Sequence, residues 1–146
     1  MSILIIGAGH AGGSVAANLR QLGSDAPITI IGDEPHLPYQ RPPLSKAWLK
    51  ANVAFSAVGL RPQSFYDQRG IILRLDTRAT AISRDAHMIT LADGEILPYR
   101  TLILATGARA RRLGLAGEDL PGVHVLRTIV DADRVKVQGV VIGVLR

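Results

Sequence analysis

The sequence contains no cysteine, and this absence removes several kinds of chemistry at once. Disulfide bonds, thiolate metal sites and redox-active cysteine pairs all need the cysteine sulfur. Histidine does not replace it, because the four histidines are dispersed and have no carboxylate at a metal-ligand spacing. They are His10, His36, His87 and His124. We therefore expect no metal site and no disulfide chemistry.

Long apolar runs and aromatic residues are also scarce. No segment reaches the roughly 20 apolar residues that a membrane-spanning helix needs, and the N-terminus lacks the basic region of a signal peptide. Aromatic residues make up 4% of the 146, so stacking platforms for nucleic-acid bases are not expected despite a net charge of +5. Apart from a cluster at Arg109, Arg111 and Arg112, the arginines are scattered and are interpreted as solvated. The sequence predicts a soluble, cytoplasmic protein with no membrane or nucleic-acid partner.

The first dozen residues organise the rest of the chain. The apolar run Ile3–Ile6 predicts a short buried strand, and Gly7, Gly9 and Gly12 follow at the G-x-G-x-x-G spacing. Gly7 permits the tight turn, Gly9 lets a pyrophosphate approach the backbone, and Gly12 lets the next helix pack closely. Amides at the start of that helix favour phosphate. The alternative is a glycine-rich turn without a ligand.

The residues after the glycines support a nucleotide site. A helix is predicted, with Gly23 at its C-terminal end, and a second strand is predicted at Ile28–Ile31. Asp33 then lies about twenty residues beyond the glycines, where an acidic residue binds ribose hydroxyls. The apolar face of the helix is predicted to contain Ala11, Val15, Leu19 and Leu22.

A proline-rich segment, residues 34–46, follows the second strand. Pro35, Pro38, Pro42 and Pro43 stiffen it. Ser45 is predicted to cap a short helix, with Lys46 in its first turn. The helix dipole disfavours a cation there, so a functional role for Lys46 is considered: a positive charge near an electron-rich group.

The following stretch predicts a small antiparallel meander inserted in a parallel sheet. Strands are expected at residues 71–75, 79–83, 87–91 and 96–98, and Asp93-Gly94 is a strong hairpin turn. Residues 101–107 then predict a buried parallel strand that ends at Thr106 and Gly107. The fold class is therefore α/β, with a Rossmann-like nucleotide-binding sheet.

Two segments together resemble one enzyme family. Gly-Ala-Gly-His-Ala-Gly-Gly at residues 7–13, and residues 31–46 with their Arg-Pro-Pro-Leu-Ser-Lys ending, are similar to the N-terminus of the FAD-dependent, NAD(P)H-using ferredoxin, rubredoxin and putidaredoxin reductases. These belong to the larger pyridine nucleotide–disulfide reductase group. The absence of cysteine agrees with this branch, which works without a redox disulfide.

The resemblance implies which residues contact FAD. Asp33 would hold the adenosine ribose, and Lys46 would lie near the flavin ring. Ala79 would contact the adenine end through its backbone, and Arg127 would make a further cofactor contact. The complete implied set is Gly7, Gly9, Ala11, Gly12, Asp33, Arg41, Lys46, Ala79, Thr106, Gly107 and Arg127. No catalytic residue is assigned. The family passes electrons from NAD(P)H through FAD to a ferredoxin-like iron–sulfur protein.

The chain departs from the family after residue 138. Gln138–Gly143 resembles the start of the NAD(P)H-binding strand, but no second G-x-G-x-x-G follows. We therefore expect a truncated arrangement: residues 1–112 as the first segment of the FAD-binding domain, and residues 113–146 as a connector and aborted start of the NAD(P)H-binding domain. Turnover by this chain alone is not expected. A non-catalytic fragment and a small NAD-binding dehydrogenase domain remain as alternatives.

Overall fold

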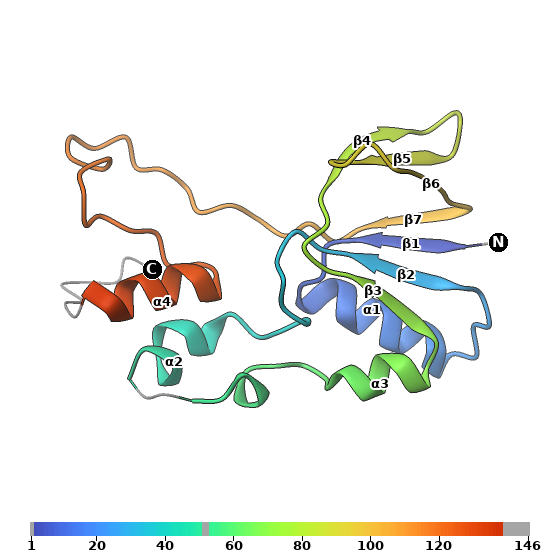
Figure 1. Ribbon diagram of the computed structural model, residues 1–146, viewed down its shortest axis with the longest axis horizontal. Coiled ribbons are helices and arrows are strands. Elements are labelled where there is room, and N and C mark those ends of the chain that lie inside the picture. The colour runs from blue at the N-terminus through green and yellow to red at the C-terminus, as the bar shows by residue number, and fades with distance from the viewer. Residues whose placement is uncertain (1, 51–52, 139–146) are drawn as a thin grey trace. The chain divides into compact units, whose positions relative to one another are not determined.

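The computed structural model describes residues 2–50 and 53–138, which form two compact units (Figure 1). Within these ranges, the first unit comprises residues 2–39 and 59–107. The second comprises residues 40–50, 53–58 and 108–138. The predicted strand at Gln138–Gly143 lies almost entirely outside the described residues. Residues 2–50 and 53–138 include no helix long and apolar enough to span a membrane.

The first unit is built on a four-stranded parallel sheet. Its strands are β1 (Ile3–Ile6), β2 (Ile28–Ile31), β3 (Ile71–Arg74) and β7 (Thr101–Leu104), in the order β3-β2-β1-β7. All three pairings are parallel, and β1 aligns Ile3 with Ile28 on one side and with Thr101 on the other. The predicted Rossmann-like α/β fold is confirmed.

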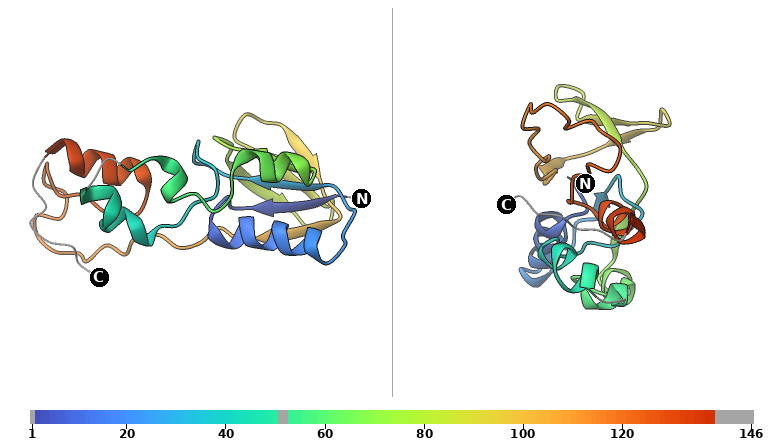
Figure 2. Two further views of the ribbon diagram at one scale, coloured as in Figure 1. Left: turned by 90° about the horizontal axis from the view of Figure 1, so that it is seen from below. Right: turned by 90° about the vertical axis from the view of Figure 1, so that its left-hand side faces the viewer.

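Helices α1 (His10–Gln21) and α3 (Gln63–Gln68) lie side by side on one face of this sheet (Figures 1 and 2). Between them and the strands is a core in which Ile5, Ile30 and Tyr66 are fully buried. Burying an aliphatic side chain of this size stabilises the fold by roughly 1.5–3 kcal/mol. The burial of this face therefore holds α1 and α3 against the sheet.

The opposite face of the sheet is covered by the predicted meander. Its strands are β4 (Ala79–Ser83), β5 (Met88–Leu91) and β6 (Ile96–Pro98), which pair antiparallel in sequence order (Figure 1). Ile89 and Leu91 of β5 point inward and pack with Leu4 and Ile31 of the parallel sheet. The expected insertion of an antiparallel meander between two parallel strands is confirmed.

The second unit consists of short helices. They are the 3-10 turns η1 (Pro42–Ser45) and η2 (Phe55–Ala57) and the α-helices α2 (Ala47–Lys50) and α4 (Ile129–Gln138). Helices α2 and α4 pack against each other, and Leu44, Trp48, Ile129 and Ala132 are buried. The helix expected from residue 131 onward is confirmed and begins two residues earlier.

The prediction that the buried face of α1 contains Ala11 and Leu22, its first and last members, is wrong. Ala11 is exposed, and Leu22 is 84% exposed. The residues buried along α1 are Gly12, Gly13 and Ala16, which allow a closer approach to the sheet than larger residues would. The predicted end of the helix is confirmed: Gly23 has a φ of +81°, and the N–H groups of Gly23 and Ser24 donate to Arg20 and Leu19 in a Schellman motif.

Two further expectations need correction. Strand β7 is parallel as predicted but is not buried, since Thr101 and Leu104 are exposed at the edge of the described sheet. Ser45 does not cap α2, because the prolines start a 3-10 turn in which Ser45 is the last residue. Its hydroxyl donates to the Pro42 carbonyl at 3.5 Å, and Lys46 lies just before α2 rather than in its first turn.

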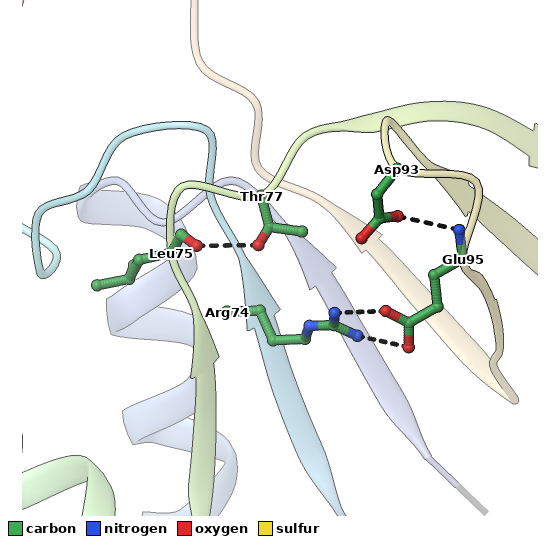
Figure 3. Close-up of polar contacts among 5 residues, drawn as sticks. All are labelled: Arg74, Leu75, Thr77, Asp93 and Glu95. Atoms are coloured by element: carbon green, nitrogen blue, oxygen red, sulfur yellow. Dashed lines mark hydrogen bonds and ion pairs between the residues drawn. The ribbon is translucent and has the colours of Figure 1, made fainter.

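A salt bridge joins the parallel sheet to the meander (Figure 3). The Arg74 guanidinium, at the end of β3, donates two hydrogen bonds to the Glu95 carboxylate, at 2.5 and 2.9 Å. The Asp93 carboxylate accepts the Glu95 N–H at 2.9 Å and so holds the hairpin turn that carries Glu95. The hydrogen bond from Arg74 lowers the pKa of the Glu95 carboxyl.

This lowered pKa predicts how the salt bridge responds to acid. Its stabilisation is complete above the ordinary glutamate pKa and is lost as the pH falls through the lowered value. Between wild type and Glu95→Gln, we expect the largest difference in melting temperature at neutral pH and a smaller one on acidification. Asp85→Asn, an exposed acid in the β4–β5 turn, is the control. Thermal unfolding at a series of pH values measures this, and a difference that is independent of pH would contradict it.

Candidate functional site

The carboxyl ends of the four parallel strands meet at a topological switch point. The chain passes from β1 to β2 and β3 on one side, then returns to the other side of β1 as β7. Open α/β sheets bind ligands at such points, beyond the carboxyl ends of the strands. The Gly7 N–H donates to Ile31 at 2.7 Å and the Ala105 N–H donates to Ile6 at 2.7 Å, so β1 is fixed to both neighbours where it ends.

Three glycines form the turn between β1 and α1, and each meets a different environment. Gly7 has a φ of +114°, and a Cβ there would lie 2.2 Å from the Ala105 carbonyl oxygen. A Cβ on Gly12 would lie 2.0 Å from the Gly7 carbonyl oxygen. Gly9 differs, because a Cβ there would meet nothing within 4 Å. Gly7 and Gly12 therefore serve the fold, whereas Gly9 leaves open space in front of the backbone.

The start of α1 is free of side chains that would compete with an anion. Gly9 is the N-cap, no side chain bonds to the first amides, and the first turn carries no acidic residue. The first intrahelical bond of this turn runs from the Gly13 N–H to the Gly9 carbonyl at 3.0 Å. The N–H groups before it, including that of exposed Ala11, point out of the helix start, where the helix dipole attracts phosphate. The residues present thus fit a pyrophosphate.

Two acidic residues follow β2, and their surroundings separate their roles. The Glu34 carboxylate is half-buried and accepts a hydrogen bond from the Tyr39 hydroxyl at 2.5 Å. Asp33 is exposed, and its neighbour Gly32 is held by a hydrogen bond to the Arg74 carbonyl at 2.9 Å. Glu34 therefore stabilises the loop, and Asp33 is the acid available to a ribose.

The remaining predicted residues of the first unit lie near these strand ends or against the meander. Thr106 and Gly107 lie just beyond β7, after Ala105, and are exposed, and Gly107 has a φ of +71°. Ala79 is the first residue of β4 and packs partly buried on the core between the two sheets. Its side chain is committed to packing, which suits a residue that would contact a ligand through its backbone.

In the second unit, the structure brings together two of the three predicted cations. Arg41 donates from Nη1 to the Arg127 carbonyl at 2.8 Å, although the two are far apart in sequence. Lys46 is exposed and lies between η1 and α2, where its N–H donates to the Pro43 carbonyl at 3.0 Å. Each of the two units thus carries its own set of predicted site residues.

Sequence reasoning missed a capping box at the start of α4. The Thr128 hydroxyl accepts the Asp131 N–H at 3.2 Å, and the Asp131 carboxylate accepts the N–H groups of Thr128 and Arg127 at 2.8 and 3.1 Å. The Thr-x-x-Asp spacing was the available signal. Asp131 therefore fixes the backbone of a predicted cofactor residue.

The first unit also contains a small pocket that no sequence pattern indicated. It has a volume of about 150 Å³ and is lined by His10, Gly13, Ser14, Ala17, Leu60 and Arg61. Behind Gly13 lies the Tyr66 hydroxyl, which is buried and has no hydrogen-bond partner among the described residues. Burial raises the pKa of Tyr66, and the nearby charge of Arg61 lowers it by a smaller amount.

Among residues 2–50 and 53–138, no group of three or more His, Asp or Glu side chains is placed to hold a metal ion.

Comparison with known sequences gives a consistent result. The family described as pyridine nucleotide-disulphide oxidoreductase matches residues 1–143. The chain is 47% identical over 133 residues to rhodocoxin reductase of Rhodococcus erythropolis, covering 91% of this chain and 31% of that protein.

Solved structures agree with the sequence comparison. The ferredoxin reductase for the CYP199A2 system of Rhodopseudomonas palustris superposes with a TM-score of 0.87 at 42% identity, covering 94% of this chain and 34% of that one. The reductase in a covalent putidaredoxin reductase–putidaredoxin complex gives a TM-score of 0.85 at 37% identity, with 94% and 34% coverage. The chain therefore spans about a third of the length of the relatives it matches.

The different surroundings of Gly12 and Gly9 predict different effects of adding one methyl group. Gly12→Ala forces β1 and α1 apart, and we expect it to lower the free energy of unfolding by roughly 1–3 kcal/mol. Gly9→Ala enters open space and should cost less, about 0.5–1 kcal/mol, because alanine is a poorer N-cap than glycine. Denaturant unfolding followed by circular dichroism measures both, and equal losses would contradict the assignment.

Proposed function

This chain belongs to the pyridine nucleotide-disulphide oxidoreductase family, and we propose that it is the FAD-binding portion of an NAD(P)H-dependent flavoprotein reductase. The observation that carries the proposal is the start of α1: uncapped amides, open space at Gly9, and exposed Asp33 after the neighbouring strand. These groups fit the pyrophosphate and ribose of a dinucleotide.

The roles of the individual residues follow from their positions. In the first unit, backbone amides from Gly9 to Gly12 would hold the pyrophosphate and Asp33 would accept hydrogen bonds from the ribose hydroxyls. Small residues at Gly9, Ala79, Thr106 and Gly107 would let the cofactor approach the backbone. In the second unit, Arg41, Lys46 and Arg127 would supply positive charge to the cofactor.

When bound, FAD would supply hydride acceptance from NAD(P)H and release of single electrons to a ferredoxin-like iron–sulfur protein. Rhodocoxin, ferredoxin and putidaredoxin, in the names of the related reductases and complexes, support a partner of this kind. We propose residues 1–112 as the first segment of the FAD-binding domain and residues 113–146 as a connector together with the start of an NAD(P)H-binding domain. Within this chain, the nucleotide fingerprint Gly7, Gly9 and Gly12 supports the FAD-binding part of the reductase activity.

Flavin uptake is the direct test. We expect the purified chain, after incubation with FAD and desalting, to keep the visible absorption bands of an oxidised flavin. NADH in place of FAD is the comparison, because a simple NAD-binding domain would retain NADH and no flavin. A chain that binds neither would support the alternative of a non-catalytic fragment.

The ribose assignment has its own test. Asp33→Ala removes an ionised hydrogen-bond acceptor, and we expect it to weaken FAD binding by roughly 1.5–3 kcal/mol. Asp25→Ala is the matched control, because Asp25 is also exposed but precedes β2, at the opposite end of that strand. Titration followed by flavin fluorescence measures both affinities. Equal affinities of Asp33→Ala and Asp25→Ala would refute the ribose role.

A further inference from the structure

The second unit holds all three cations assigned to the cofactor, and two aspartates of α4 form hydrogen bonds to residues near them in the chain or to one of them directly. The cations are Arg41, Lys46 and Arg127, and the aspartates are Asp131 and Asp133. Like charges gathered in one small unit repel each other, so a defined arrangement needs bonds that fix it. The hydrogen bonds of this unit supply them.

Asp131 fixes Arg127 through its main chain. Its Oδ2 accepts the N–H of Arg127 at 3.1 Å and that of Thr128 at 2.8 Å. On the other side of the residue, the Arg127 carbonyl accepts Nη1 of Arg41 at 2.8 Å. The main chain of Arg127 is therefore held from both directions, and Arg41 is tied to the same point. Neither of these contacts uses the guanidinium group of Arg127.

Asp133 fixes the second helix, and with it Lys46. Its Oδ1 accepts the indole Nε1–H of Trp48 at 2.9 Å, which joins α4 to α2. Trp48 is 8% exposed and belongs to the packed contact between the two helices. Lys46 precedes α2, and its carbonyl accepts the Lys50 N–H at 3.1 Å. The bond from Trp48 to Asp133 therefore holds α2 against α4, and Lys46 is the residue just before α2.

We propose that Asp131 and Asp133 are positioning residues, which hold Arg41, Lys46 and Arg127 as a preformed set of cations before the anionic cofactor binds. The proposal rests on the proposed function for the identity of that cofactor as FAD. A backbone arranged in advance loses less conformational freedom when the cofactor binds, which raises affinity without any new contact. Neither aspartate would touch FAD.

The first experiment needs no cofactor. The chain has one tryptophan, so its indole N–H gives a single NMR cross-peak. We expect that proton to exchange slowly with water in the wild type and rapidly in Asp133→Ala, with the amide signals around Lys46 shifted. Asp119→Asn, which removes an exposed carboxylate bonded to Arg112 in the same unit, is the control and should leave the indole signal unchanged. An indole proton that exchanges at the same rate in Asp133→Ala as in the wild type would overturn the proposal.

The second experiment measures FAD affinity and the position of the visible flavin band. We expect Asp133→Ala and Asp131→Ala each to weaken FAD binding about tenfold. Asp133→Ala should also shift the flavin band, because the charge of Lys46 is displaced when α2 loses its bond to Asp133. Asp133→Asn keeps an acceptor oxygen for the indole and should retain affinity within about threefold of wild type. A merely structural role would lower the melting temperature of the alanine variants while FAD affinity and the flavin band stayed unchanged.

These results distinguish the positioning role of Asp131 and Asp133 from the proposed FAD-binding function. If wild type binds FAD and the alanine variants bind it equally well, the positioning role is refuted and the proposed function stands. If wild type binds no FAD while the indole signal still responds to Asp133→Ala, the proposed function fails and the role toward FAD fails with it. Loss of affinity in both alanine variants with rescue by Asp133→Asn supports the positioning role.

Discussion

The close approach of β1, β7 and α1 at two glycines is the constraint on which the first unit depends. A single added carbon at Gly7 or Gly12 would come within 2.2 Å of a carbonyl oxygen that cannot move without shifting a strand. Because these two positions have no side chain, the end of β1 lies against the end of β7 and the helix begins at once. The open space at Gly9 is a consequence of that packing, and the candidate phosphate site lies there.

The second unit is held together by a small apolar contact and by hydrogen bonds to aspartate side chains. Its helices are short, and helices of this length are not stable by themselves. Buried Trp48 and Leu44 supply the apolar contact, Asp133 joins α4 to the indole of α2, and Asp131 holds the backbone at the start of α4. Polar groups therefore specify the arrangement that the small core cannot specify alone. Such a unit holds charged side chains at defined places with few residues.

Local patterns in the sequence predicted most of the first unit. The strand Ile3–Ile6, the glycine turn and the Asp-Gly hairpin depend on neighbouring residues, and all three are confirmed. The errors have non-local causes: Leu22 is exposed because the burial of α1 centres on its glycines, and Leu104 because β7 is an edge strand. The bond from Arg41 to Arg127 joins residues on separate segments, so no local pattern indicated it. The assigned cofactor roles stay predictions.

The insertion of the meander between β3 and β7 has a consequence for how the chain folds. Strand β1 pairs with β7 through Ile3 and Thr101, so the central strand finds one of its two partners only after the meander has been synthesised. Pairings between such distant segments form slowly, whereas the β4-β5-β6 hairpins bring together neighbours in sequence. During synthesis on the ribosome, the strand that contains Leu4 and Ile5 therefore has one side unpaired until β7 has been made.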